Sequence, residues 1–485
     1  MWPTTVMEIL FAGGFLSLAA DLAGPSAFLK RYAAGLVVAA ALALSIAVLL
    51  SDWPSVLGGI VQLQPVKEPF ASVYVVDRYT TFTAFTALVV GFAVVAYSTL
   101  YFESGRRGPF YALLSIMMCT LVGVVSAGDL LTLFLFWEGM TVSAYGLVTF
   151  GRGQLSMEAG IKYFFMAGIG SLLVLYGIAA VYFSTGSILI GSIGLSLTTS
   201  FGQLGFAVLL LGLGVEAAVV PLHTWLPDVY SASPIPTASV VSGAVTGVAV
   251  FGILKVVQPL VPGGGYLPPG LQPVGGTGAI ELILAALALL SMTVGNLSAL
   301  VQGNVRRMLS FSSVAQTGYM LAALSTMSAP GLVAAVFTIW NHGLLKSNLF
   351  MAIGKRGSTV EGSQLDSLKG AGRSDRMFGF LFGSSSLALM GAPPFGMFWS
   401  EILVIQALLF AGPAGTVFYL LAAAVVINIV LSTGYYFRVV NTVVFGETSG
   451  SREAVPRIDL LPSISLLALS LVTGIAPFVI LGWVL

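Results

Sequence analysis

The sequence has little charge. Lys, Arg, Asp and Glu together make up 8% of its 485 residues, whereas 57% of the residues are hydrophobic. About a quarter of the residues of a soluble globular protein are charged, so that class is excluded. The formal net charge of +1 leaves no field that would recruit nucleic acid or an acidic partner. The single cysteine, Cys119, lies in an apolar run and is interpreted as packing.

The sequence contains many long apolar runs. Runs of roughly the length that spans a bilayer begin near Thr5, Ala33, Arg78, Phe110, Asp129, Gly160, Phe201, Ile235, Ile280, Phe311, Gly331, Met377, Gly415 and Leu461. We therefore predict an all-α, polytopic membrane protein with about 14 transmembrane helices.

Two of these runs are interrupted by proline. The seventh contains GVEAAVVPLHTWLPDVYSASPIP at residues 214–236, and the twelfth contains GAPPFGMFWSE at residues 391–401. Proline lacks the N–H that a helix needs, and open backbone in a bilayer occurs where protein or a watery cavity surrounds it. Because the interruptions are five helices apart, we expect two inverted five-helix repeats, residues 110–258 and 279–440. Residues 1–109 and 441–485 would then flank the repeats as helices 1 to 3 and helix 14.

The basic residues predict the orientation. Fifteen of the 20 Lys and Arg residues fall in or beside odd-numbered loops, which therefore face the cytoplasm and leave both termini outside. The longest of these loops, residues 355–376, holds no nucleotide-binding glycine pattern, no Cys/His set with metal spacing and no nucleophile elbow. We therefore expect no cofactor, no metal and no redox site in this chain, and assign any redox chemistry to other subunits.

Four titratable side chains of the first half lie in predicted membrane segments. Glu138 is in the middle of the fifth helix. Lys162 is near the cytoplasmic end of the sixth, where it either extends to the interface or balances the charge of Glu138. Glu216 and His223 flank Pro221 in the interrupted seventh run. The structural alternative for Glu138 is a hydrogen bond to a neighbouring helix, but an acid inside the membrane favours an ion path, as does Glu216 beside a backbone break. For His223, capping or packing and a proton relay both stay open.

The second half adds three such groups. His342 and Lys346 are spaced i, i+4 and share a face of the eleventh helix, either as a relay or as a structural polar seam. Glu401 follows the second interruption. Together the seven side chains form a sparse series of titratable groups, which is typical of a proton wire. Charged residues nearer the helix ends are interpreted as interfacial groups or topology anchors: Glu8, Asp21, Lys255, Glu281, Arg306, Arg307 and Arg438.

The segments around these residues resemble the antiporter-like membrane subunits shared by respiratory complex I, energy-converting membrane hydrogenases and Mrp-type cation/proton antiporters. They are DLLTLFLFWEGMTVSAYGL, IKYFFMAGIGS, VVPLHTWLPDVYSASPIPTASVVSG, NVRRMLSFSSVAQTGYM, NHGLLKSNLF and GAPPFGMFWSE. The last is most similar to the hydrogenase-type branch. The resemblance implies that protons move along a central hydrophilic axis, with Glu138 and Glu401 at its glutamate positions and His342 and Lys346 at its polar positions.

Two positions depart from the family pattern. The lysine usual on the seventh helix falls on Glu216, and the lysine usual on the eighth helix falls on Gly247. These changes make the first half-channel more negative, so we expect either that one carboxyl takes a proton or that a cation such as Na⁺ binds between Glu138 and Glu216. The loss of both lysines also weakens the expectation that this half pumps ions.

The resemblance implies a proton- or Na⁺-translocating subunit in the cytoplasmic membrane of a prokaryote. Its expected partners are the lipid bilayer, further antiporter-like subunits and a redox module that drives the complex. Three alternatives stay open: a subunit of an Mrp-type Na⁺/H⁺ antiporter, a non-pumping structural homologue within such a complex, and the membrane half of an inorganic-carbon uptake system.

The orientation gives a direct prediction. In intact cells, an impermeant thiol reagent should label a single cysteine placed at the C-terminus, because both termini are expected outside. A single cysteine placed in residues 355–376 should stay unlabelled until the cells are opened. Both variants are made in a background in which Cys119 is replaced by serine. Labelling of the 355–376 position from outside would contradict the orientation.

Overall fold

The structure is a computed structural model that describes residues 2–23, 27–56, 61–63, 74–102, 107–151, 153–262, 278–411, 415–447 and 460–484. Nearly all of these residues are helical, as the long apolar runs predict. A short antiparallel pair of strands, β1 (Val61–Leu63) and β2 (Tyr74–Val76), is an exception that the sequence did not reveal. The predicted boundary between the repeats, residues 259–278, lies mostly outside the described ranges.

The first half of the chain forms a series of helices with short 3-10 and π segments. In order they are α1 (Trp2–Ala23), α2 (Ala27–Val56), α3 (Arg78–Tyr101), α4 (Gly108–Ser126), α5 (Leu130–Thr149), α6 (Gln154–Thr185), η1 (Ile190–Ser192), α7 (Ile193–Ser196), α8 (Ser200–Glu216), α9 (Leu226–Ala232), α10 (Ile235–Val240), η2 (Val241–Val245), α11 (Thr246–Val257) and η3 (Gln258–Leu260).

The second half continues in the same way. Its elements are α12 (Gly278–Leu300), α13 (Val305–Ser325), α14 (Ala329–Ile353), η4 (Gly354–Gly357), α15 (Ala371–Ser374), α16 (Arg376–Leu389), α17 (Gly396–Leu409), α18 (Thr416–Phe445), α19 (Leu461–Ile475) and α20 (Pro477–Val484).

The length and apolar character of the helices fit a polytopic membrane protein. Among the described residues, nine helices are long and apolar enough to cross a membrane, and ten if the bent pair α19 and α20 counts as one span. The shorter apolar helices α8 and α17 belong to the interrupted runs. The number of 14 spans and the inverted symmetry of the two halves stay predictions.

Both interruptions lie where the prolines predict them. In the seventh run α8 ends at Glu216 and α9 begins at Leu226, with a cis peptide bond at Pro221 between them. In the twelfth run α16 ends at Leu389 and α17 begins at Gly396. Two further irregularities were not predicted: the π-helix η2 within the eighth run, and the bend of 88° between α19 and α20. A π segment inserted in a helix often marks a functional site.

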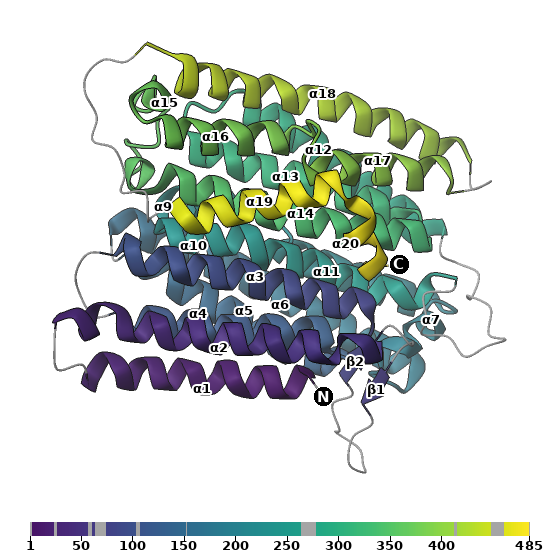
Figure 1. The fold of residues 1–485 in the computed structure, drawn as a ribbon. Helices are drawn as coiled ribbons and strands as arrows, with labels where there is room; N and C mark the ends of the chain where they lie inside the picture. Colours follow the sequence, from purple (N-terminus) through teal and green to yellow (C-terminus); the bar gives the residue numbers. More distant parts are fainter. Residues whose placement is uncertain are drawn as a thin grey trace.

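The helices lie side by side with their axes running in roughly the same direction (Figure 1). α1 and α2 lie at one edge of this bundle and α18 at the opposite edge, and the two termini lie at the same end. α14 is the centre, because every residue from Gly331 to Ile353 is buried. It packs against α3, α10, α13, α16, α17 and α19.

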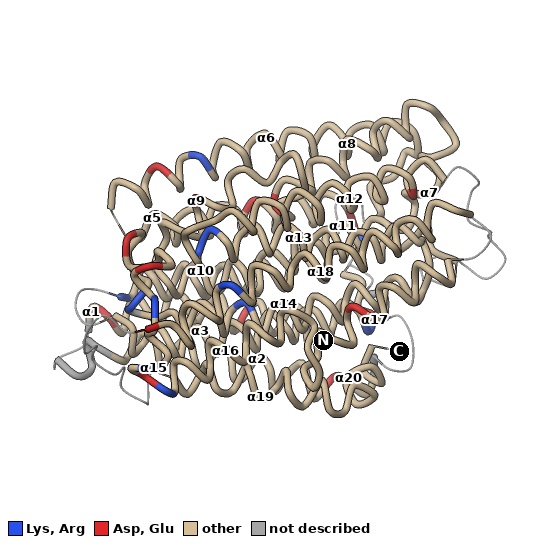
Figure 2. The backbone as a smooth tube through the Cα atoms, turned by 90° about the horizontal axis from the view of Figure 1, so that it is seen from above, with Lys and Arg blue, Asp and Glu red and all other residues tan. Residues whose placement is uncertain are grey.

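Charged residues are concentrated at one end of this bundle. Figure 2 shows most Lys and Arg residues toward the end where α9 and α15 lie. The termini lie at the other end in Figure 1. The predicted orientation rests on this distribution of Lys and Arg residues. Which side of the membrane each end of the bundle faces stays a prediction.

Glycine allows α6 and α8 to pack closely. A Cβ on Gly212 of α8 would lie 2.7 Å from the backbone nitrogen of Val174 and 2.8 Å from the carbonyl oxygen of Gly170, both in α6. Gly168 is in the same helix as Gly170 but has nothing within 4 Å of its Cβ position. The backbone contact between α6 and α8 therefore depends on Gly212.

Substitution of these glycines should have opposite effects on stability. Gly212→Ala forces α6 and α8 apart and should destabilise the protein by about 1–3 kcal/mol. Gly168→Ala is the matched control and should be neutral or stabilising by up to about 1 kcal/mol, because alanine favours a helix. The measurement is the midpoint of thermal unfolding of the purified protein in detergent. Equal midpoints for the two variants would contradict the packing described here.

Candidate functional site

The break after α8 is held together by hydrogen bonds that replace helical ones. The last carbonyls of a helix have no partner in the helix itself. Here the carbonyl oxygen of Val215 accepts from Ala218 N at 3.1 Å and from Trp225 Nε1 at 2.8 Å. Ala218 has a φ of 52°, a left-handed conformation that costs a non-glycine residue roughly 1–2 kcal/mol. The end of α8 is therefore a fixed and mildly strained position.

Glu216 is the last residue of α8 and is buried, with 2% of its surface exposed. Its Oε1 accepts hydrogen bonds from Thr141 Oγ1 of α5 at 2.9 Å and from Tyr163 Oη of α6 at 3.0 Å. A buried carboxyl without partners would be strongly disfavoured, and these two hydroxyls stabilise it. The structure thus places a predicted site residue at the meeting point of three helices.

Glu138 lies near the Glu216 site but faces outward. It is half-buried on α5, one helical turn before Thr141, and accepts a hydrogen bond from Ser171 Oγ of α6. Because Thr141 contacts Glu216, the two glutamates belong to the same region of the structure.

Of the two alternatives for Lys162, the structure does not show the pairing with Glu138. Lys162 Nζ forms an ion pair with Asp228 in the first turn of α9. Ser171, which contacts Glu138, is nine residues further along α6, a distance of about 14 Å along the axis. That separation is too long for a lysine side chain to span.

The adjacent arginines of α13 do more than anchor the topology. Arg307 Nη1 lies 2.8 Å from Asp228 Oδ1, so that this carboxylate bridges α6 and α13. Arg306 was interpreted as a topology anchor, but it is fully buried. Its guanidinium donates to the carbonyl oxygens of Ser233, at the end of α9, and Gly357. These carbonyls replace the water that a surface arginine would bind.

His223 lies in the connection between α8 and α9 and is half-buried. Its Nδ1 has no hydrogen-bond partner within the described part of the chain, and its ring centroid is 6.1 Å from that of Phe311. The hydrogen bonds of Glu216 come from α5 and α6, so the structure does not join His223 to Glu216. The break explains this, because residues seven apart share a face in a continuous helix but not across an interruption.

His342 and Lys346 lie in the buried centre of the bundle on α14. Lys346 Nζ donates to the carbonyl oxygen of Leu309 in α13 at 2.7 Å. Neither ring nitrogen of His342 has a hydrogen-bond partner among the residues that the structure covers. Such atoms are rare in protein interiors and mark positions where water or a transient partner is expected.

Glu401 is buried on α17, close to the second interruption. Its carboxylate lies directly against Gly391, where any side chain would overlap Oε2. Gly391 also has a φ of +76°, so this position requires glycine on both grounds. Next to Glu401, Ser400 Oγ accepts from Asn341 Nδ2 at 3.0 Å. Glu401 follows Ser400 in the chain, and His342 follows Asn341. The hydrogen bond between Ser400 and Asn341 therefore places Glu401 and His342 in the same region of the structure.

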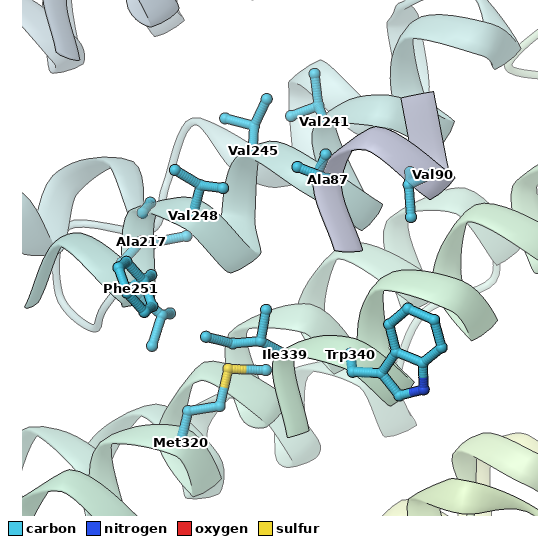
Figure 3. Close-up of a cluster of buried hydrophobic side chains, with 14 of the residues drawn as sticks. Ala87, Val90, Ala217, Val241, Val245, Val248, Phe251, Met320, Ile339 and Trp340 are labelled. Carbon is cyan, nitrogen blue, oxygen red and sulfur yellow. The ribbon is translucent and has the colours of Figure 1, made fainter. Parts of the chain in front are cut away.

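Gly247, the position to which the sequence resemblance assigns the eighth-helix lysine, lies against apolar side chains. A Cβ on Gly247 would lie 2.9 Å from Cγ2 of Ile339. Ile339 belongs to a cluster of buried hydrophobic side chains, in which Figure 3 labels Ala87, Val90, Ala217, Val241, Val245, Val248, Phe251, Met320, Ile339 and Trp340. Ala217 follows Glu216 in the chain, and Trp340 lies two residues before His342. The cluster therefore reaches from the Glu216 site to the polar part of α14.

Lys255 was predicted to lie at the interface, and this prediction is wrong. The side chain is fully buried at the end of α11. Its Nζ donates to Val125 O at 2.8 Å, Val75 O at 3.1 Å and Thr80 Oγ1 at 3.2 Å. Three oxygens match the three donors of an ammonium group and take the place of water.

Several polar residues of these regions were missed from the sequence. Thr141 and Tyr163 contact Glu216 from other helices, so no local spacing reveals them. Asp228 lies in the HTWLPD segment, and that motif was an available signal. A further buried network joins α12, α13 and α18: Tyr435 Oη donates to Asn296 Oδ1 at 3.1 Å, and Asn296 Nδ2 donates to Tyr319 Oη at 3.0 Å.

A family model described as NADH:quinone oxidoreductase/Mrp antiporter, TM, matches residues 127–432. NADH-quinone oxidoreductase subunit N 1 of Sorangium cellulosum is 32% identical over 390 residues, which cover 77% of this chain and 74% of that protein. NADH-quinone oxidoreductase subunit N of Acidithiobacillus ferrooxidans is 30% identical over 422 residues, or 84% of each protein.

Solved structures with the same fold come from three kinds of complex. A chain of respiratory complex I from Thermus thermophilus has a TM-score of 0.79 at 26% identity and covers 98% of both chains. A chain of an archaeal membrane-bound sulfane sulfur reductase has a TM-score of 0.87 at 24% identity, covering 99% of this chain and 96% of that one. A chain of an Mrp complex from Dietzia sp. has a TM-score of 0.86 at 21% identity, covering 100% and 95%. As its motifs predict, the chain belongs to the NADH:quinone oxidoreductase/Mrp antiporter family of membrane subunits.

Proposed function

We propose that this antiporter-like subunit carries protons across the membrane within a redox-driven, complex I-related assembly, such as a membrane-bound hydrogenase or a related oxidoreductase. The observation that carries the proposal is the burial of Glu216 at the end of an interrupted membrane helix, between hydroxyl groups of two neighbouring helices. A carboxyl in such a place is costly to the fold, and its expected use is to bind and release an ion.

The geometry around Glu216 favours a proton over Na⁺. Sodium requires several oxygen lone pairs directed at one point. Thr141 and Tyr163 instead donate their hydrogens to the carboxylate, so their lone pairs point elsewhere. Ser171 also donates its hydrogen to Glu138. Sodium coupling stays the second possibility for the ion, and the experiment below separates the two.

The second half supplies the continuation of the path. His342, Glu401, Gln316 and Thr317 each hold a buried side-chain polar atom that lacks a partner among the described residues. They lie on α13, α14 and α17, which pack against one another. Internal water at these atoms would join them into a relay. We assign Lys346 to the same path, and His223 to the route toward the charged end of the bundle.

Neighbouring subunits are the proposed source of energy for this path. On α5, Glu138 shares a face with Leu131, Leu135 and Val142, spaced three or four residues apart and all exposed. A half-exposed carboxyl on an apolar face of a membrane helix is disfavoured against lipid. We infer that another membrane subunit, such as a second antiporter-like one, covers this face, while lipid surrounds the rest and a redox module drives the assembly.

A specific observation favours one rival function. The apolar cluster of Figure 3 contains Ala217, which follows Glu216 in the chain, and Trp340, which lies two residues before His342 on α14. A tightly packed apolar region excludes water, which a proton path requires. This arrangement supports the non-pumping structural role. For the Mrp-type antiporter and the inorganic-carbon uptake system, the genes next to this one provide the test: redox subunits favour our proposal, and small membrane subunits without them favour the Mrp type.

Replacement of Glu216 tests the proposal. Glu216→Gln keeps the hydrogen-bonding shape but cannot exchange a proton, so proton translocation should fall by roughly tenfold or more. The measurement is acidification of proteoliposomes that contain the purified complex, followed with a pH-sensitive dye. Glu281→Gln is the control, since Glu281 lies in the first turn of α12 and in neither interrupted run.

The outcomes are distinct. A sodium dependence that is lost in Glu216→Gln would favour Na⁺ over the proton. Full translocation in both Glu216→Gln and Glu138→Gln would mean that the first half carries no ions, and the structural role would then be the better account.

A further inference from the structure

We propose that Asp228 is a positioning residue through which the second half of the protein sets the hydrogen bonding of Glu216. The inference rests on the proposed role of Glu216. Asp228 lies in the first turn of α9, the short helix after the break. Its two carboxylate oxygens are shared between Lys162 of α6, in the first half, and Arg307 of α13, in the second half.

α9 is held at both ends by adjacent residues of α13. Arg307 pairs with Asp228 at the N-terminal end of α9. Arg306 donates to the carbonyl oxygen of Ser233, the C-terminal cap of α9. An acid at the start of a helix and a cation at its end both match the helix dipole. A shift of α13 along its axis would therefore carry α9 with it.

Two contacts pass the position of α9 on to Glu216. Trp225 immediately precedes α9, and its indole Nε1 donates to the carbonyl oxygen of Val215, the neighbour of Glu216. The indole ring also packs against Tyr163, with 4.8 Å between the ring centroids. Tyr163 in turn donates to Glu216 at 3.0 Å. Because Lys162 precedes Tyr163 in α6, the ion pair with Asp228 holds the same part of α6 from the other side.

The solvent exposure of Lys162, Arg307 and Asp228 indicates that their ion pairs add little to the stability of the fold. The side chains of Lys162, Arg307 and Asp228 are 45%, 38% and 29% exposed, so water and salt screen their attraction. Such pairs contribute little to the stability of a fold. Loss of Asp228 should therefore change the free energy of unfolding little, while it removes the ion pairs that join the first turn of α9 to α6 and α13.

The test is a double-mutant cycle in the intact complex, read as proton translocation in proteoliposomes. Asp228→Asn should reduce translocation by about fivefold, and Asp228→Glu, which keeps the charge, should restore most of it. Tyr163→Phe removes the hydroxyl that Asp228 is proposed to position. The Asp228→Asn/Tyr163→Phe double variant should therefore translocate within about twofold of Tyr163→Phe alone. Asp366→Asn, an exposed acid in the loop after α14, is the control and should change neither background.

Three results would overturn the inference. The first is normal translocation in Asp228→Asn. The second is a double variant in which the two losses multiply, because the residues would then act independently. The third is a loss that follows a lower unfolding temperature and is not restored by Asp228→Glu, which would make the role structural. Failure of the proposed function is a separate result, namely full translocation in both Glu216→Gln and Glu138→Gln.

Discussion

The constraint on which the rest of this structure depends is that a bilayer offers no hydrogen bonds to open backbone or to charge. Every interruption of a membrane helix must therefore be completed by the protein. In the seventh run Trp225 supplies the bond that the carbonyl of Val215 lost, and hydroxyls from α5 and α6 surround the carboxyl of Glu216. The break after α8, where the protein must supply these hydrogen bonds, also holds the titratable carboxyl of Glu216. That coincidence is the basis for assigning the site a function.

The two halves meet this constraint with different chemistry. The first half holds carboxyls, Glu138 and Glu216, supported by serine, threonine and tyrosine hydroxyls. The second half holds His342 and Lys346 in the buried α14 and one acid, Glu401, against the second interruption. An apolar cluster that includes Ile339, which lies against Gly247, also contains Ala217, next to Glu216 in the chain, and Trp340, two residues before His342. The cations of the first half contact other partners than Glu216: Lys162 pairs with Asp228 of α9, and the buried Lys255 donates to Val75, Thr80 and Val125.

The sequence predicts well what depends on local rules. Proline places both interruptions, and the rarity of charge singles out Glu216, His342 and Glu401, which the structure buries. The sequence fails where partners come from distant helices: Lys162 pairs with Asp228, 66 residues away, and not with Glu138. Lys255 and Arg306 lie near helix ends, and the sequence therefore did not reveal that they are buried. Loops and neighbouring helices cover those helix ends. Pairing is a property of the packed bundle, and single residues do not reveal it.

The central claim is that the carboxyl of Glu216 exchanges a proton as the complex works. Its most direct measurement is difference infrared spectroscopy of the purified complex during turnover, with and without deuterium exchange. If Glu216 exchanges a proton, a carboxyl C=O stretching band should appear or shift on turnover, move in heavy water and be absent in Glu216→Gln. Turnover spectra in which every carboxyl band is unchanged by Glu216→Gln would contradict it.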